Sequence, residues 1–174
     1  MRFKRDYSAF LKRKWDWLVS RFKPLTIHTE AIFIDEVWEK IKERVKKGDV
    51  KKWYVMTPEN YDLYKSSFNV KIPKEKLSKI MKARYKWMIE NGQKLELHVH
   101  LSLTMNKMSY SEQEKIIGNA IRWMKQEIEV TPREFVPGWW SYDENTLKVL
   151  KKYGLKMIYP RDYDYGHDYE WELK

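Results

Sequence analysis

Two histidines in one ten-residue segment are the residues of this chain best suited to chemistry. Residues 94–103 alternate strictly between polar and apolar side chains, and this pattern predicts a β-strand because strand side chains point to opposite faces in turn. His98 and His100 would then share one face, with Cα atoms roughly 6.5–7 Å apart. That spacing would allow both imidazoles to bind one metal ion. An exposed polar face on an antiparallel edge strand gives the same pattern, so both interpretations stay open.

Composition limits the chemistry that these histidines could support. The chain of 174 residues has no cysteine, which excludes disulfides, thiolate nucleophiles and cysteine zinc sites and leaves His, Asp and Glu as metal ligands. Hydrophobic residues make up 43% and aromatic residues 16% of the chain, as expected for a single folded domain with a buried core. Many Lys and Glu residues and no Cys form a composition found in thermophilic proteins.

The first 23 residues carry most of the excess positive charge. They contain eight basic and two acidic residues, and so +6 of the net charge of +10. Their apolar residues recur at helical spacing, which predicts a basic amphipathic helix over residues 1–23. Such a helix commonly packs against its own domain, but it could also contact an anionic membrane or a nucleic acid. With no apolar run of the ~18–20 residues that span a membrane and no signal-peptide core, we expect a cytoplasmic protein.

Strands and helices alternate from residue 24 to the end of the chain, and we expect one domain over residues 24–174. The predicted strands are residues 25–33, 52–56, 94–103, 133–137 and 155–159. The helices between them begin near residues 35, 73, 111 and 143. This alternation predicts an α/β fold with a parallel sheet. Because no Gly-rich phosphate loop is present, a (β/α) barrel is favoured over an open nucleotide-binding sheet.

Several segments resemble the motifs of one known family. Residues 135–154 begin Phe-Val-Pro-Gly and continue with a tyrosine, acidic residues, a threonine, a leucine and a final glycine, similar to the third motif of the polysaccharide deacetylases. Gly92 followed by Leu-Glu-Leu-His98 resembles their second motif, and residues 26–30 lie where the first motif carries its acidic pair. The chain thus resembles a shortened, divergent polysaccharide deacetylase domain (NodB-like, carbohydrate esterase family 4).

The resemblance implies a distorted (β/α) barrel that hydrolyses N-acetyl or O-acetyl groups of a carbohydrate or a related small amide. A divalent metal, usually zinc, would be held by one acidic residue and two histidines. Carried onto this chain, the metal ligands are Glu30, His98 and His100, the catalytic base is His28 and a possible acid is His167. Trp139, Trp140 and Tyr142 are candidates for substrate binding, although adjacent aromatics at a barrel mouth also serve simply to cover it.

Three departures from the family pattern leave the activity open. The first motif has His28, Thr29 and Glu30 instead of two successive acidic residues, and the residue four positions after His98 is a serine instead of a second histidine. The third motif has Val136 in place of arginine, and a neutral histidine base would suit the loss of that cation. The alternative is a catalytically degenerate barrel that serves as a binding or assembly module and contacts a polyanion through residues 1–23.

Overall fold

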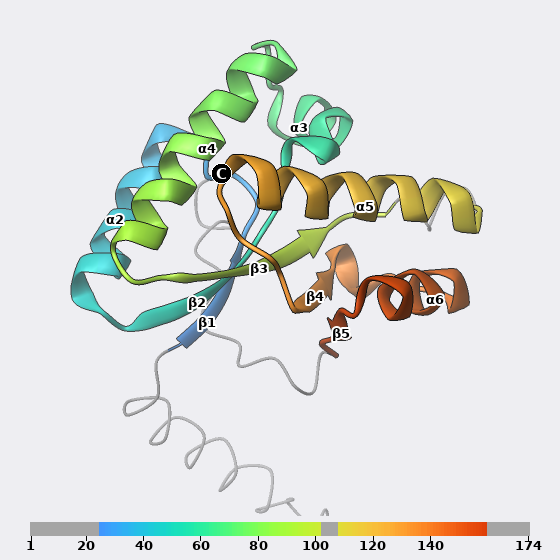
Figure 1. Ribbon diagram of the computed structural model, residues 1–174. Coiled ribbons are helices and arrows are strands. Elements are labelled where there is room, and N and C mark those ends of the chain that lie inside the picture. Colours follow the sequence, from blue (N-terminus) through green and yellow to red (C-terminus); the bar gives the residue numbers. More distant parts are fainter. Residues whose placement is uncertain (1–24, 102–107, 160–174) are drawn as a thin grey trace, which may run out of the picture.

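The computed structural model describes residues 25–101 and 108–159, which form an α/β fold around a parallel sheet (Figure 1). The strands are β1 (Leu25–Thr29), β2 (Val50–Val55), β3 (Lys94–Val99), β4 (Glu134–Pro137) and β5 (Lys156–Met157). They lie in the order β1-β2-β3-β4-β5, and each neighbouring pair is parallel. The predicted class is therefore confirmed.

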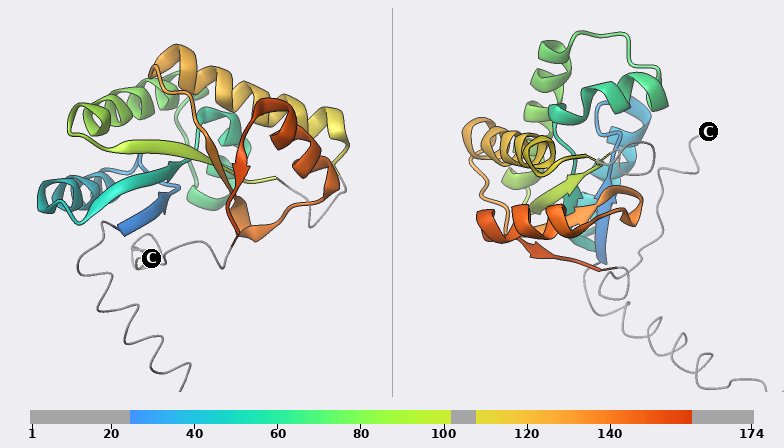
Figure 2. Two further views of the ribbon diagram at one scale, coloured as in Figure 1. Left: turned by 60° about the horizontal axis from the view of Figure 1, so that its bottom comes forward. Right: turned by 90° about the vertical axis from the view of Figure 1, so that its right-hand side faces the viewer.

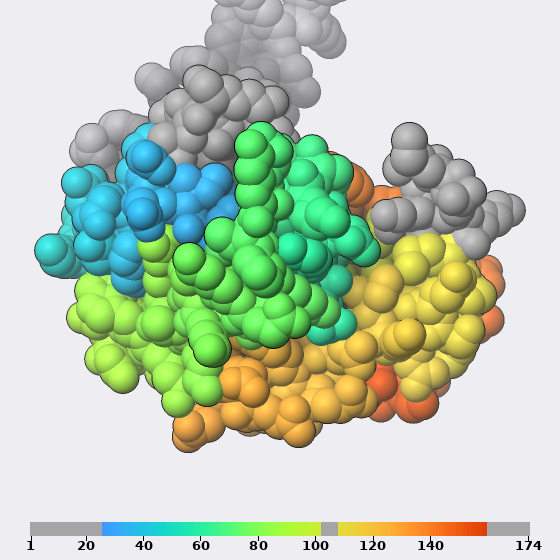
Figure 3. All heavy atoms as spheres, turned by 90° about the horizontal axis from the view of Figure 1, so that it is seen from above, coloured from blue at the N-terminus to red at the C-terminus, as the bar shows by residue number. Residues whose placement is uncertain are grey.

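Helices connect each strand to the next. They are α2 (Asp35–Lys47), η1 (Pro58–Asn60), α3 (Tyr61–Phe68), α4 (Lys74–Glu90), α5 (Tyr110–Glu127), η2 (Gly138–Trp140) and α6 (Glu144–Tyr153). Helices α4 and α5 lie on the same side of the sheet (Figures 1 and 2). Seen from that side, the atoms of α4 and α5 form much of the visible surface (Figure 3). None of the described helices is long and apolar enough to cross a membrane.

Sequential order of parallel strands is also the order of a (β/α) barrel. Among the described residues, however, the sheet has two edges, β1 and β5, and no pairing joins them. The part of the fold that the structure describes is thus a five-stranded parallel sheet, without barrel closure. The predicted helix at residues 1–23 and the candidate acid His167 lie outside the described residues.

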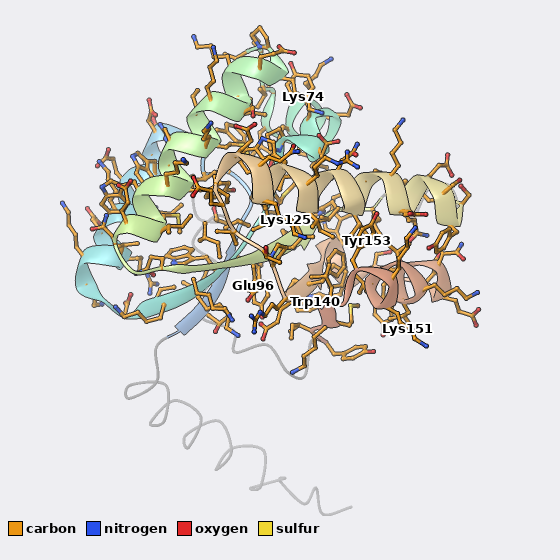
Figure 4. The ribbon with its side chains drawn as sticks, in the orientation of Figure 1. Lys74, Glu96, Lys125, Trp140, Lys151 and Tyr153 are labelled. Atoms are coloured by element: carbon orange, nitrogen blue, oxygen red, sulfur yellow. The ribbon has the colours of Figure 1, made fainter. Side chains whose placement is uncertain are left out.

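The two faces of the sheet differ in chemistry. On the helix-covered face, alternate strand residues such as Ile27, Trp53, Leu97 and Phe135 enter the main apolar core with the buried faces of the helices. The opposite face carries mostly polar side chains, and Figure 4 places Glu96 there. Because strand side chains alternate between faces, burying one set against the helices places the other set, including Glu96 and His98 of β3, on the opposite face.

The strand ends differ from the predicted ones because each strand pairs only as far as its neighbours allow. The predicted strand 94–103 ends at Val99, whose partner Pro137 is the last residue of β4. The predicted strand 25–33 ends at Thr29, opposite the last residue of β2, Val55. The turn predicted at residues 57–60 continues into a helix, α3, that the sequence pattern did not indicate.

Helix α6 begins at a capping box formed by Asp143 and Thr146, which holds the region of the third motif. The Asp143 carboxylate accepts hydrogen bonds from Thr146 N at 2.9 Å and from Gln113 Nε2 of α5 at 3.0 Å. Burial raises the pKa of Asp143, but the hydrogen bonds from Thr146 and Gln113 outweigh it, so this pKa lies below its ordinary value.

We expect Asp143→Ala to lower the free energy of unfolding by about 1 kcal/mol at neutral pH, as loss of a helix N-cap does. Since the folded pKa is lowered, the contribution is complete above about pH 4 and is lost as pH falls through the folded pKa. Urea unfolding at several pH values would measure it. Glu144→Ala, at an exposed acidic residue of the same turn, should cost less, and equal costs would contradict the capping role.

Candidate metal centre

Four polar side chains come together at the carboxyl ends of β1 and β3, across β2. They are those of His28, Glu30, His98 and His100. The register pairs His28 with Tyr54 and Tyr54 with Glu96. Two residues further along the chain from His28 and Glu96 come Glu30, directly after β1, and His98 in β3. The side chains of Glu30 and His98 therefore lie at the same level above the sheet. The predicted acidic ligand, Glu30, is thus in contact with the predicted pair His98 and His100.

Three donor atoms meet at one point of this site, the metal pocket, which is named for its candidate ligands Glu30, His98 and His100. Oε1 of Glu30 lies 2.8 Å from Nε2 of His100 and 3.3 Å from Nε2 of His98, and the two nitrogens are 3.1 Å apart. A tetrahedral ion with ligand bonds of about 2.0–2.1 Å separates its ligand atoms by about 3.3 Å. The spacing of the three donors fits a metal of the size of zinc after small adjustments.

His28 gives a second way to group the donors. His28, Glu30 and His98 offer ligand atoms that all lie within 4.8 Å of one another, and Nε2 of His28 is 4.0 Å from Oε1 of Glu30. Both groups share Glu30 and His98. We favour His100 as the third ligand because its distances are nearer to the tetrahedral value, and this leaves the more exposed His28 beside the group.

A backbone carbonyl fixes the proton of His98. Nδ1 of His98 lies 2.9 Å from the oxygen of Val136 in β4, and a carbonyl only accepts hydrogen bonds, so Nδ1 carries the proton. Burial lowers the pKa of His98 below its ordinary value despite the nearby Glu30 carboxylate, which keeps the ring neutral. Its Nε2 lone pair therefore points toward Glu30, as a metal ligand requires.

The Glu30 carboxylate is held in its ionised form. Burial by itself raises its pKa, but the interactions led by the hydrogen bond from His100 outweigh burial and hold the pKa well below its ordinary value. Two electron-rich atoms, Oε1 of Glu30 and Nε2 of His98, then face each other at 3.3 Å. A cation between or beside the two atoms would meet the resulting need for positive charge. The N–H of His100 meets this need in part, and a divalent metal would meet it for all three ligands.

His100 lies just beyond β3 and is held by its surroundings. Its carbonyl oxygen accepts a hydrogen bond from Nδ2 of Asn60 at 2.9 Å. Its ring lies against Gly138, where an added Cβ would come within 2.2 Å of the ring, and the Trp139 indole meets the ring edge-to-face with centroids 4.3 Å apart. Nδ1 of His100 is buried and has no hydrogen-bond partner among the described residues.

The aromatic candidates separate into two kinds. Trp139 and Tyr142 are 52% and 39% exposed. Trp140 is half-buried and packs against a small apolar cluster of Tyr54, Val136 and Ile158, on the face of the sheet away from α4 and α5 (Figure 4). Trp139 and Trp140 have φ angles of 51° and 55°, in the left-handed region that bulky residues rarely adopt. The turn therefore presents Trp139 outward while it packs Trp140.

Sequence reasoning missed the residues that orient the ligands. Asn60 of η1 binds the backbone of His100 and the carbonyl of Val136 in β4 binds the ring of His98. A backbone acceptor leaves no sign in the sequence. Glu96 is also structural: its Oε2 accepts hydrogen bonds from the backbone N–H groups of Arg133 and Glu134 at 2.7 and 2.9 Å and so fixes the start of β4. The sequence signal that could have indicated this role is the position of Glu96 on the polar face of the predicted strand 94–103.

Comparison with known proteins identifies the family. A family model described as "Polysaccharide deacetylase" matches residues 25–158, more than half of the chain. The chain belongs to the polysaccharide deacetylase family. The match spans β1 to β5 and thus includes every described residue of the metal pocket. A comparison with proteins of curated function finds no match.

Solved structures of this family share the fold. A pseudoenzyme of family CE4 from Bacillus anthracis, BA3943, superposes with a TM-score of 0.57 at 18% identity, over 78% of this chain and 41% of that one. A BA3943 mutant described as having restored enzymatic activity gives 0.56 at 17%, over 78% and 44%. A family 4 carbohydrate esterase from Streptomyces lividans, in complex with acetate, gives 0.50 at 12%, over 77% and 59%. The chain spans less than two thirds of each of these proteins.

The close approach of Gly138 to His100 gives a test of the pocket. We expect Gly138→Ala to displace the His100 ring and weaken zinc binding at least tenfold, as disturbed support of a ligand does, measured by calorimetric titration with Zn²⁺. Gly92→Ala is the control: it has open space around its Cβ but a φ of +74°. It should cost stability and leave zinc affinity unchanged. Wild-type affinity in Gly138→Ala would show that His100 is not a ligand.

Proposed function

We propose that this chain is a metal-dependent deacetylase that hydrolyses N-acetyl or O-acetyl groups of a carbohydrate or a related small amide. The observation that carries the proposal is the meeting of Glu30, His98 and His100 within 2.8–3.3 Å, with His28 beside them. Metal dependence is general among the deacetylases of this family, and the donor set suits zinc.

Each residue of the pocket has a defined part in the proposed reaction. Glu30, His98 and His100 would hold the metal, which when bound supplies Lewis acidity toward an acetyl carbonyl. His28 would take the proton of the attacking water, because it is the imidazole next to the ligand group that is not itself a ligand. Trp139 and Tyr142 would offer exposed aromatic faces to a sugar ring. The possible acid, His167, stays a prediction.

The departure at Val136 agrees with a histidine base. The Val136 side chain packs with Tyr54 and Ile158 and brings no positive charge to the pocket. A cation there would disfavour uptake of a proton by His28, whereas an apolar residue does not. The same substitution, together with the altered first motif, is compatible with a degenerate barrel that binds a ligand without turnover. The similar fold of BA3943, described both as a pseudoenzyme and as a mutant with restored activity, supports neither state over the other.

Metal content separates the two proposals. We expect the untagged protein to bind close to one equivalent of Zn²⁺, and the His98→Ala/His100→Ala double mutant to lose it, as measured by elemental analysis after dialysis. His28→Ala should retain the metal. A folded protein that takes up no zinc when it is supplied would support the degenerate form, and loss of zinc in His28→Ala would make His28 a ligand.

The pH dependence of turnover tests the base. If neutral His28 is the active form, kcat/KM for an acetylated oligosaccharide should rise with pH through a single ionisation in the range of histidine, around pH 6–7. His28→Ala should lower kcat by 10²-fold or more, the usual contribution of a general base, with zinc content unchanged. Turnover equal to that of the wild type in His28→Ala would show that His28 has a structural role.

A further inference from the structure

Helix α4 supports the exits of two strands with adjacent residues. The Tyr85 hydroxyl donates a hydrogen bond to the carbonyl of Met56, directly after β2, at 2.7 Å. Nη1 of Arg84 donates to the carbonyls of Ile32 at 2.6 Å and Ile34 at 3.2 Å, in the loop after β1. The helix therefore binds the backbone at the carboxyl ends of the strands, where the metal pocket also lies.

The loop that Arg84 contacts begins with the acidic ligand. Glu30 directly follows β1, and the next residues form a turn in which Ile34 N donates to the carbonyl of Ala31 at 2.9 Å. Ala31 and Ile32 are buried. A shift of this turn would move the backbone of Glu30, and with it the carboxylate that faces His98 and His100.

The guanidinium of Arg84 is suited to hold several acceptors at once. Besides the two carbonyls it pairs with the Asp35 carboxylate at the start of α2, and it lies 5.5 Å from the centroid of the Trp38 ring. The planar fork of arginine serves such a set of acceptors with fixed geometry, which a lysine ammonium does not reproduce.

We propose that Arg84 is a positioning residue of the metal centre: by holding residues 31–34 it keeps Glu30 within reach of His98 and His100. The inference rests on the proposed metal site. Arg84 contacts neither a ligand side chain nor a reacting atom, so it acts only through the backbone that carries Glu30.

Arginine-to-lysine variants at two matched positions test this role. Arg84 and Arg44 have side chains that are 14% and 15% exposed and both pair with an aspartate, but Arg44 contacts Asp49, beyond the far end of α2 from Glu30. We expect Arg84→Lys to weaken Zn²⁺ binding 10-fold or more in calorimetric titration, while Arg44→Lys stays within twofold of the wild type. Thermal unfolding should show similar losses of Tm in both variants.

An unchanged zinc affinity in Arg84→Lys, or an equal loss in Arg44→Lys, would overturn the proposal. Asp35→Asn separates the carbonyl contacts from the ion pair. The Asp35 side chain is 84% exposed, so its removal should alter zinc affinity less than twofold. A tenfold loss in Asp35→Asn would assign the effect to the ion pair instead of the loop backbone and would also overturn the proposal.

Amide hydrogen exchange keeps this test separate from that of the metal site. In zinc-free protein, Arg84→Lys should raise the exchange rates of residues 31–34 relative to Arg44→Lys, with no change in β3. A wild-type protein that binds no zinc would refute the proposed function, and the exchange data would then decide the role of Arg84. Unchanged exchange in residues 31–34 would refute that role as well.

Discussion

The hydrogen bond from His98 Nδ1 to the carbonyl of Val136 is the interaction on which the pocket depends. It places the proton on the side of the ring that faces β4 and turns the Nε2 lone pair toward the Glu30 carboxylate. Two electron-rich atoms at 3.3 Å create a local demand for positive charge. Under the proposed function, a metal ion would satisfy that demand for Glu30, His98 and His100 together, whereas the N–H of His100 satisfies it only partly.

The scaffold maintains this arrangement through backbone contacts. The carbonyl of Val136 orients His98, Nδ2 of Asn60 holds the carbonyl of His100, and the guanidinium of Arg84 binds the loop after Glu30. Each contact comes from a different element, so the pocket depends on the correct register of β1 to β4. The buried Glu96 carboxylate contributes to that register by binding the backbone N–H groups at the start of β4.

Membership of the polysaccharide deacetylase family and the geometry of the pocket address different questions. The family match accounts for the sequential parallel sheet. Under the proposed function, activity would depend on this chain's own residues at the motif positions, namely His28 and Glu30 in the first motif, His100 beyond β3 and Val136 in β4. Fold alone does not decide function, and these positions are where the enzyme and the degenerate binding module would differ.

The sequence by itself determined the α/β class and the common face of His98 with its neighbouring polar residues, because strand periodicity and the alternation of strands with helices are local properties. It also indicated Glu30, His98 and His100 as one group through family resemblance. Only the tertiary structure decided that β3 ends before His100, that Trp140 packs while Trp139 is exposed, and that Asn60, Arg84 and the Val136 carbonyl support the pocket. These features arise from contacts between segments distant in the chain, and a backbone carbonyl or a strand partner has no signature in the local pattern of side chains.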